Sequence, residues 1–254
     1  MLVLTVVGAR PQFVKAAVVS RALRRSHREV LLHTGQHYDD AMSDLFFREL
    51  GLPAPDLHLG VGSGTHAEQT GRMLMGIEAA VRDHHPDVVL VYGDTNSTLA
   101  GALAAAKLGV AVAHVEAGCR SGDRAMPEEV NRVVADHLSR VLFCPTRVTV
   151  ENLAREGITA GVHLVGDVML DLCRERLPEA ERRSTLLGDL GLEPGGYLVA
   201  TIHRAANTDD PSRLAALVAA LGSLEEPVVF PVHPRPRAAR GGTARVRVDR
   251  FARR

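Results

Sequence analysis

Two carboxylates directly follow two consecutive apolar runs in the middle of the chain. Asp94 comes after the run 88–92 and Gly93, and Glu116 comes after the run 110–115. A helix-like stretch of small residues separates the runs, which is the pattern of a βαβ unit. In a right-handed unit of this kind both strands end at the same edge of a parallel sheet. We therefore expect Asp94 and Glu116 to face one crevice.

A third carboxylate comes from Glu128, in the first turn of the helix that Pro127 opens. Several acids in one cleft could remove a proton from a substrate and return one. Glu128 has a structural alternative, because an acid in a first turn complements the helix dipole and can pair with Arg132 four residues on.

The other two acids also have structural alternatives. Asp94 lies in a polar stretch, 93–98, that suits helix capping, although one cap suffices and several polar side chains remain spare. Glu116 could form a salt bridge to Arg120 or Arg124. His114, inside the second run, is expected to be a hydrogen-bonded histidine of the core.

Cations stand at two other strand ends. Arg10 and Lys15 follow the first apolar run, 2–7, at the start of a helix, where free main-chain N–H groups bind anions. The spacing matches neither the P-loop nor the dinucleotide fingerprint, so an ordinary turn with surface cations is the alternative. His203 and Arg204 end a later strand and suit a pyrophosphate, unless they form a solvent-exposed loop pair.

Strands that alternate with helices predict an α/β protein with doubly wound parallel sheets. We expect a Rossmann-like domain at 1–170, a partial second one at 171–234 and an arginine-rich irregular tail at 235–254. The predicted strands are 2–7, 29–33, 88–92, 110–115, 141–144, 162–165, 197–202 and 227–232. The predicted helices include 12–25, 41–50, 67–84, 146–156 and 211–221, with 166–171 as the crossing between domains.

Composition excludes several classes of function. The 254 residues carry a formal net charge of zero, which argues against nucleic-acid and membrane-surface partners. The three cysteines lack a CxxC spacing and the twelve histidines lack HExxH, so no metal is expected. No apolar run approaches the ~18 residues of a membrane span, and the opening run lacks the features of a signal peptide. These features predict a cytoplasmic protein.

Nine segments, in order, resemble the non-hydrolysing UDP-N-acetylglucosamine 2-epimerases. They read GARP, TGQHYD, HAEQTGRML, PDVVLVYGDTNSTLAGALAA, HVEAGCRS, MPEEVNR, LFCPT, VGDVMLD and TIHRAANTDD. The resemblance covers residues 1 to about 234. It implies two Rossmann-like units of the glycosyltransferase-B-like type, with a UDP-sugar as the substrate and a homodimer among the expected assemblies.

The resemblance also implies a mechanism. A base removes the C2 proton of the sugar while UDP leaves C1, and the resulting glycal takes a proton on its other face before UDP returns. No NAD or other cofactor is required, because nothing is oxidised. The implied catalytic residues are Asp94, Glu116, Glu128 and His203. The implied contacts to the UDP-sugar are Arg10, Lys15, Gln36, His37, Thr95, Arg132, Arg204 and His233.

Two departures from the family keep alternatives open. The family's second domain continues for roughly another hundred residues, with a Ser-Gly-Gly loop and a glutamate that bind uridine and ribose. Ala206 also stands where the family usually has Glu. An inactive truncated remnant is therefore one alternative. An epimerase of UDP-2,3-diacetamido-glucuronic acid and a related glycosyltransferase-B enzyme are the others.

Overall fold

Apolar runs of the first 165 residues form a seven-stranded sheet in the computed structural model, which describes residues 1–36, 49–202, 205–231 and 246–249. Every pair of neighbouring strands is parallel, and their order is β3-β2-β1-β4-β5-β6-β7. The strands are β1 (Leu2–Val7), β2 (Arg28–His33), β3 (Leu57–His58), β4 (Val88–Tyr92), β5 (Ala111–Val115), β6 (Val141–Cys144) and β7 (Val162–Leu164). The order reverses between β1 and β4, and ligands of open α/β sheets bind at such a reversal, beyond the carboxyl ends of the strands.

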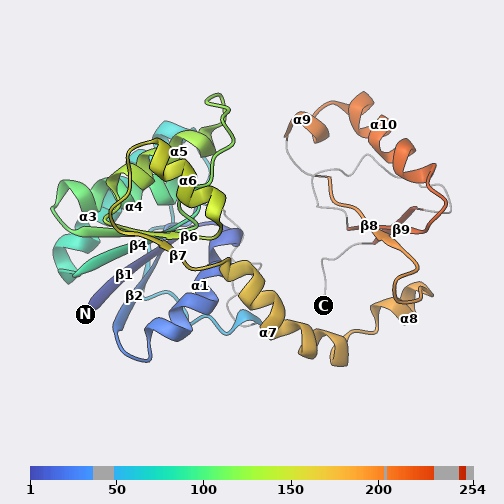
Figure 1. The fold of residues 1–254 in the computed structure, drawn as a ribbon, viewed down its shortest axis with the longest axis horizontal. Helices are drawn as coiled ribbons and strands as arrows, with labels where there is room; N and C mark the ends of the chain where they lie inside the picture. The colour runs from blue at the N-terminus through green and yellow to red at the C-terminus, as the bar shows by residue number, and fades with distance from the viewer. Residues whose placement is uncertain (37–48, 203–204, 232–245, 250–254) are drawn as a thin grey trace. The chain divides into compact units, whose positions relative to one another are not determined.

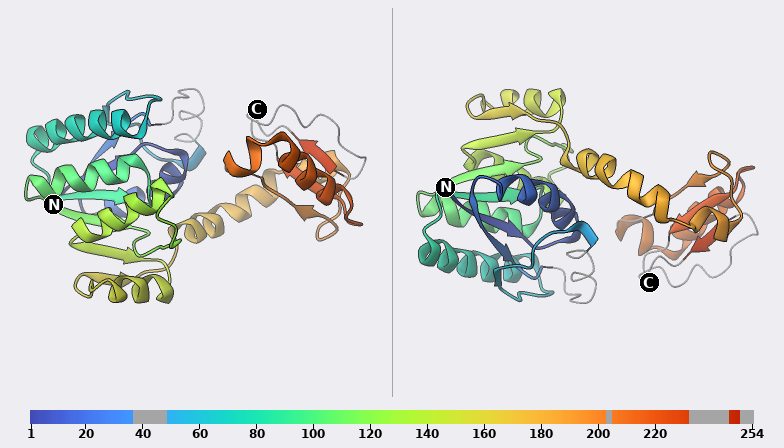
Figure 2. Two further views of the ribbon diagram at one scale, coloured as in Figure 1. Left: turned by 90° about the horizontal axis from the view of Figure 1, so that it is seen from above. Right: turned by 90° about the horizontal axis from the view of Figure 1, so that it is seen from below.

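Helices cover both faces of this sheet (Figures 1 and 2). They are α1 (Arg10–Leu23), α3 (His66–His84), α4 (Asn96–Lys107), α5 (Pro127–Leu138) and α6 (Arg147–Arg155), and a further helix, α7 (Val168–Arg183), follows β7. Alternate residues of β1 face opposite ways, as the pleat requires. Leu4 belongs to a core cluster with Met73 and Ile77 of α3, whereas Val3 belongs to another with Phe13 of α1. Burial on both faces explains why the strands read as continuous apolar runs.

The chain forms two compact units, Met1–Pro178 and Glu179–Arg254. The second contains a three-stranded parallel sheet of order β10-β9-β8. Its strands are β8 (Leu198–Val199), β9 (Val228–Pro231) and β10 (Val246–Asp249), and its helices are α8 (Leu186–Leu190), α9 (Ala205–Thr208) and α10 (Pro211–Gly222). The division of the chain at 170 and 234 stays a prediction. The expected irregular tail is corrected at β10, where the sequence Val-Arg-Val-Asp alternates as strands do.

Other elements differ from those predicted or lie outside the described residues. The segment 166–171, expected to be a crossing, mostly belongs to α7, whose polar composition and internal Pro178 hide a helix from a search for apolar periodicity. The two-residue strand β3 was not predicted, because it is too short to show a period. The predicted helix 41–50 lies almost wholly outside the described residues.

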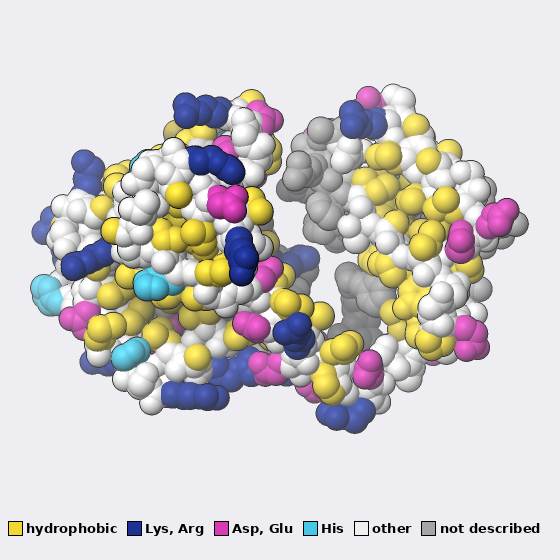
Figure 3. Space-filling view, in the orientation of Figure 1, with side chains coloured by type: hydrophobic (Ala, Val, Ile, Leu, Met, Phe, Trp, Pro, Cys, Tyr) yellow, Lys and Arg dark blue, Asp and Glu magenta, His cyan; other side chains and the backbone are white. Residues whose placement is uncertain are grey.

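Charges of both signs are mixed over the visible face of the first unit (Figure 3). None of the helices in the described part of the chain is both long and apolar enough to cross a membrane.

Candidate active site

An ion pair joins the loop after β5 to helix α1. Lys15 Nζ contacts Glu116 Oε2, and the lysine side chain is only 9% exposed. Both atoms lie beside Gly93, since a Cβ added there would lie 3.2 Å from Nζ and 3.8 Å from Oε2. Burial lowers the pKa of Lys15, and the nearby charge of Asp94 opposes that shift. Glu116 thus pairs with Lys15, and the alternative of a bridge to Arg120 or Arg124 is wrong.

A second ion pair joins the loop after β4 to helix α5. Asp94 Oδ2 contacts Arg132 Nη2, with the two side chains 35% and 13% exposed. Asn131 Nδ2 donates to the main-chain oxygen of Asp94 at 2.9 Å. Thr95, rather than Asp94, caps α4, because its hydroxyl accepts from the N–H of Thr98 at 3.3 Å. The Asp94 carboxylate therefore takes no part in this cap.

The main chain holds Glu116 in an unusual conformation. Its φ is 71°, in the left-handed region that costs a non-glycine residue about 1–2 kcal/mol. The N–H groups of Glu116 and Ala117 both donate to the Phe143 oxygen of β6, at 3.1 Å each. Such outliers persist where surrounding structure over-determines them, and they gather at functional sites.

The two neighbouring glutamates of α5 differ in their surroundings. Glu129 is 4% exposed and accepts hydrogen bonds from the N–H groups of Ser121 and Gly122. Burial alone would raise its pKa, but these bonds and the charge of Arg132 lower it. Glu128 is exposed, and within the described residues it forms no hydrogen bond or ion pair. Since Glu128 precedes Arg132 by four residues, both lie on one face of α5. The predicted Glu128–Arg132 pair is not formed, because Arg132 pairs with Asp94 and Glu129.

The start of α1 differs from expectation. The N–H groups of Gly8 and Ala9, predicted to be free for an anion, donate to Gln12 Oε1 at 2.7 and 3.0 Å. Gln12 Nε2 also donates to the Tyr92 oxygen at the end of β4. Gln12 therefore links the two loops at the reversal of strand order. An anion at this helix start would be bound by the side chains of Arg10 and Lys15 and not by these N–H groups. The sequence signal for this cap was a glutamine three residues after the N-cap residue Ala9.

The remaining predicted contacts divide into two groups. Gln36 Oε1 accepts from the N–H and hydroxyl of Ser97 at 3.1 and 2.8 Å, which ties the loop after β2 to the start of α4. His37, His203, Arg204 and His233 lie outside the described residues. Of the predicted site, the structure brings together Lys15, Arg132 and the carboxylates of Asp94 and Glu116.

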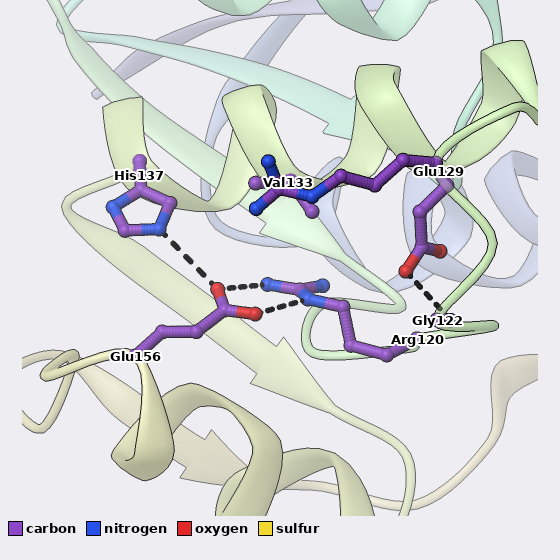
Figure 4. A pocket seen from close by; sticks show the side chains of 7 residues that line it. Arg120, Gly122, Glu129, Val133, His137 and Glu156 are labelled. Carbon is purple, nitrogen blue, oxygen red and sulfur yellow. Dashed lines mark hydrogen bonds and ion pairs between the residues drawn. The ribbon is translucent and has the colours of Figure 1, made fainter.

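A separate pocket of about 460 Å³ lies at the outer side of α5 (Figure 4). Arg120 and Glu156 face each other across it, joined by two hydrogen bonds of 2.7 Å. His137 approaches Glu156 from the other side at 3.3 Å. Asp94, Glu116 and Lys15 do not line this pocket, so it is distinct from the place of the two ion pairs.

The chain is similar to known proteins of one family. A family model described as UDP-N-acetylglucosamine 2-epimerase matches residues 21–248. A UDP-2,3-diacetamido-2,3-dideoxy-D-glucuronate 2-epimerase of Pseudomonas aeruginosa is 51% identical over 245 residues, which cover 93% of this chain and 68% of that protein. A UDP-N-acetylglucosamine 2-epimerase homolog of Methanococcus maripaludis is 50% identical over 93% of this chain and 67% of its own length.

Solved structures give the same result. The Methanocaldococcus jannaschii UDP-GlcNAc 2-epimerase, solved in complex with UDP-GlcNAc and UDP, matches with a TM-score of 0.81 and 42% identity, covering 93% of this chain and 67% of that one. The chain thus spans about two thirds of the length of these relatives, and the predicted α/β, glycosyltransferase-B-like fold class is confirmed. The chain belongs to the family of non-hydrolysing UDP-N-acetylglucosamine 2-epimerases.

Proposed function

We propose that this protein interconverts UDP-GlcNAc and UDP-ManNAc by eliminating UDP across C1 and C2 of the sugar and adding it back. The proposal rests on one observation: two ion pairs, Lys15–Glu116 and Asp94–Arg132, lie at the carboxyl ends of the strands. Both carboxylates are about one-third exposed, so a substrate can reach them.

The chemistry needs groups that exchange protons at C2 and cations that hold the departing diphosphate. Carboxylates at positions 94, 116 and 128 supply the first. Lys15 and Arg132 supply positive charge beside the acids, and Arg10 lies at the same helix start as Lys15. A substrate phosphate would replace a carboxylate as the partner of Lys15 or Arg132, which would release that carboxylate to act as a base.

One observation favours a second substrate. The P. aeruginosa relative, named for UDP-2,3-diacetamido-2,3-dideoxy-D-glucuronate, is as similar to this chain as the M. maripaludis homolog. The same elimination at C2 would serve that sugar, which differs by an acetamido group at C3 and a carboxylate at C6. We therefore propose the UDP-GlcNAc reaction first and the diacetamido-glucuronate reaction as its alternative.

The test incubates the full chain with each UDP-sugar in deuterium oxide and follows C2 by NMR. We expect deuterium at C2 and the epimer as product. Asp94→Asn should slow exchange about 10²–10⁴-fold, whereas Asp83→Asn, an exposed position on α3, should leave it unchanged.

Three other results would redirect the proposal. Absence of exchange with both sugars would contradict it. Calorimetric titration with UDP would then show whether the chain binds the nucleotide, which the alternative of an inactive remnant predicts it does not. Exchange with the diacetamido sugar alone would replace the first substrate by the second. Transfer of the sugar to an acceptor without epimerisation would indicate a glycosyltransferase.

A further inference from the structure

His114 is a buried histidine whose two ring nitrogens both face hydrogen-bond acceptors. The residue is 0% exposed, in the middle of the sheet on β5. Nδ1 lies 2.7 Å from Asp136 Oδ1, and Nε2 lies 2.7 Å from the main-chain oxygen of Gly93. A carbonyl oxygen can only accept, so Nε2 must carry a proton.

The surroundings of Asp136 decide the state of the other nitrogen. Asp136 is 1% exposed, and its Oδ2 accepts from the Gly118 N–H at 3.0 Å and from Arg120 Nη1 at 2.7 Å. Burial opposes its charge, but the hydrogen bond and the positive charge of Arg120 lower the pKa of Asp136. An ionised carboxylate only accepts, so Nδ1 of His114 must also donate.

The charges around this group balance. Asp136 neutralises His114, and Glu156 neutralises Arg120, to which it is joined by two bonds of 2.7 Å. A buried imidazolium is costly unless it is paired and hydrogen-bonded, and both conditions are met here.

The network reaches the main chain of both acid-bearing loops. Gly93, with φ of 60°, directly precedes Asp94; its N–H donates to the Val115 oxygen at 3.0 Å, and its oxygen accepts from His114. Gly118 lies two residues after Glu116, and its N–H is held by Asp136. Gly93 is thus held at both its N–H and its C=O by groups on β5, and its C=O is part of the peptide that leads into Asp94.

We propose that His114 is a positioning residue, held as an imidazolium by Asp136, which fixes the Gly93–Asp94 peptide so that the Asp94 carboxylate meets the substrate in the reactive orientation. The inference rests on the proposed epimerase function, and it adds a residue that touches no substrate. Loss of the Nε2 contact would let the peptide turn, and a small misplacement of a reacting group can cost about 10²-fold in rate.

The charge state is tested on the unmodified full chain by ¹⁵N NMR of histidine side chains at neutral pH. His114→Gln identifies the signals by removing them. We expect a proton on both ring nitrogens of His114, and a bare nitrogen at either position would overturn the inference. In Asp136→Asn the counter-charge is gone, so we expect Nδ1 to lose its proton while Nε2 keeps the one donated to Gly93.

The positioning role is tested by kinetics and by main-chain signals. His114→Gln should lower kcat for C2 exchange about 10–100-fold while KM changes less than about threefold, because the lost alignment acts in the transition state. His163→Gln, an exposed histidine on β7, is the matched control and should change neither constant. A folded His114→Gln protein with unchanged kcat would contradict the role.

These readouts also separate the two proposals. If the wild-type chain shows no C2 exchange, the proposed function fails, yet the ring-nitrogen spectrum still decides the state of His114. The Asp94 amide should then shift in His114→Gln and remain in place in His163→Gln. An unmoved Asp94 amide would overturn the positioning role without reference to activity.

Discussion

At the scale of single residues, Glu129 shows how a carboxylate next to the candidate site acts in the fold. It accepts from the Ser121 N–H at 2.9 Å, the Ser121 hydroxyl at 3.0 Å and the Gly122 N–H at 3.0 Å, and it contacts Arg132 at 3.3 Å. Arg132 also holds Asp94. Glu129 therefore orders both the loop before α5 and the cation that pairs with a predicted catalytic acid.

We expect Glu129→Gln to lower the free energy of unfolding at neutral pH by about 1–3 kcal/mol, because a buried amide would replace an acceptor of several N–H and O–H groups. The folded pKa of Glu129 lies below its ordinary value of 4.5. Its stabilisation is therefore complete above that value and is lost as the pH falls through the folded pKa. Urea unfolding at a series of pH values should show that the difference in free energy of unfolding between wild type and variant becomes smaller in acid.

The control for this measurement is Glu128→Gln. Glu128 is exposed on the same helical turn, so the free energy of unfolding of this variant should stay within about 0.5 kcal/mol of wild type. If Glu129→Gln lowers the free energy of unfolding by the same amount at every pH, the carboxylate charge is not what stabilises the fold.

The sequence predicted the positions of the site's acids but not their partners. Asp94 and Glu116 could be placed at one edge because each directly follows an apolar run, and parallel strands end together. Their ion pairs involve Lys15 and Arg132, which lie far away in the sequence on α1 and α5. The identity of such partners depends on how helices pack, which strand periodicity does not record. His114 was expected as a hydrogen-bonded core residue, and its two short contacts confirm this.

At the scale of elements, Gly8 marks the point where three segments meet. It follows β1, and a Cβ added there would lie 2.1 Å from Thr34 Oγ1 and 2.2 Å from Ser97 Oγ. Those two hydroxyls hydrogen-bond to each other at 2.8 Å. A side chain at position 8 would thus separate the end of β2 from the start of α4, next to the reversal of strand order.

We expect Gly8→Ala to destabilise the protein by about 1–3 kcal/mol, since neither neighbour can withdraw without breaking the bond between the hydroxyls. Gly71→Ala is the matched control. Gly71 lies inside α3 with open space around an added Cβ, so alanine should stabilise that helix by about 0.5–1 kcal/mol. Urea unfolding measures the free energy of unfolding of both variants. If the two substitutions change it in the same direction, the packing argument is contradicted.

The elements themselves were predicted unevenly, for physical reasons. Strands β1, β4 and β6 occur at the predicted residues, because burial on both faces makes their apolar runs continuous. The helix α7 was missed because a polar, exposed helix has no apolar period to detect. The strand β10 was missed because its arginine-rich neighbours hide a four-residue alternation.

At the scale of the whole molecule, the two units bury apolar residues to different extents. The first contains three core clusters, which involve strands β1 to β6 and helices of both faces. Among the described residues of the second, the buried apolar side chains are Leu192, Leu214, Val228, Val229 and Phe230. Its strand β8 exposes Leu198 by 42% and Val199 by 64%. Because burial of apolar area is the main favourable term in folding, the second unit should open more easily.

Amide hydrogen exchange of the full chain tests this difference. We expect amides of β1, β4 and β5 to exchange only through global unfolding, and amides of β8 and β9 to exchange through a separate opening, on the order of 100-fold faster or more. Two hydrogen bonds that hold β8 would break together in that opening. The Leu198 N–H donates to the Pro227 oxygen at 2.8 Å, and the Ala200 N–H donates to the Val229 oxygen at 3.0 Å. Equal protection in both sheets would instead mean that the units unfold as one. If UDP binds, its addition should slow exchange in α1 and in the loop after β4 whatever the second sheet does, because these two segments carry Lys15 and Asp94.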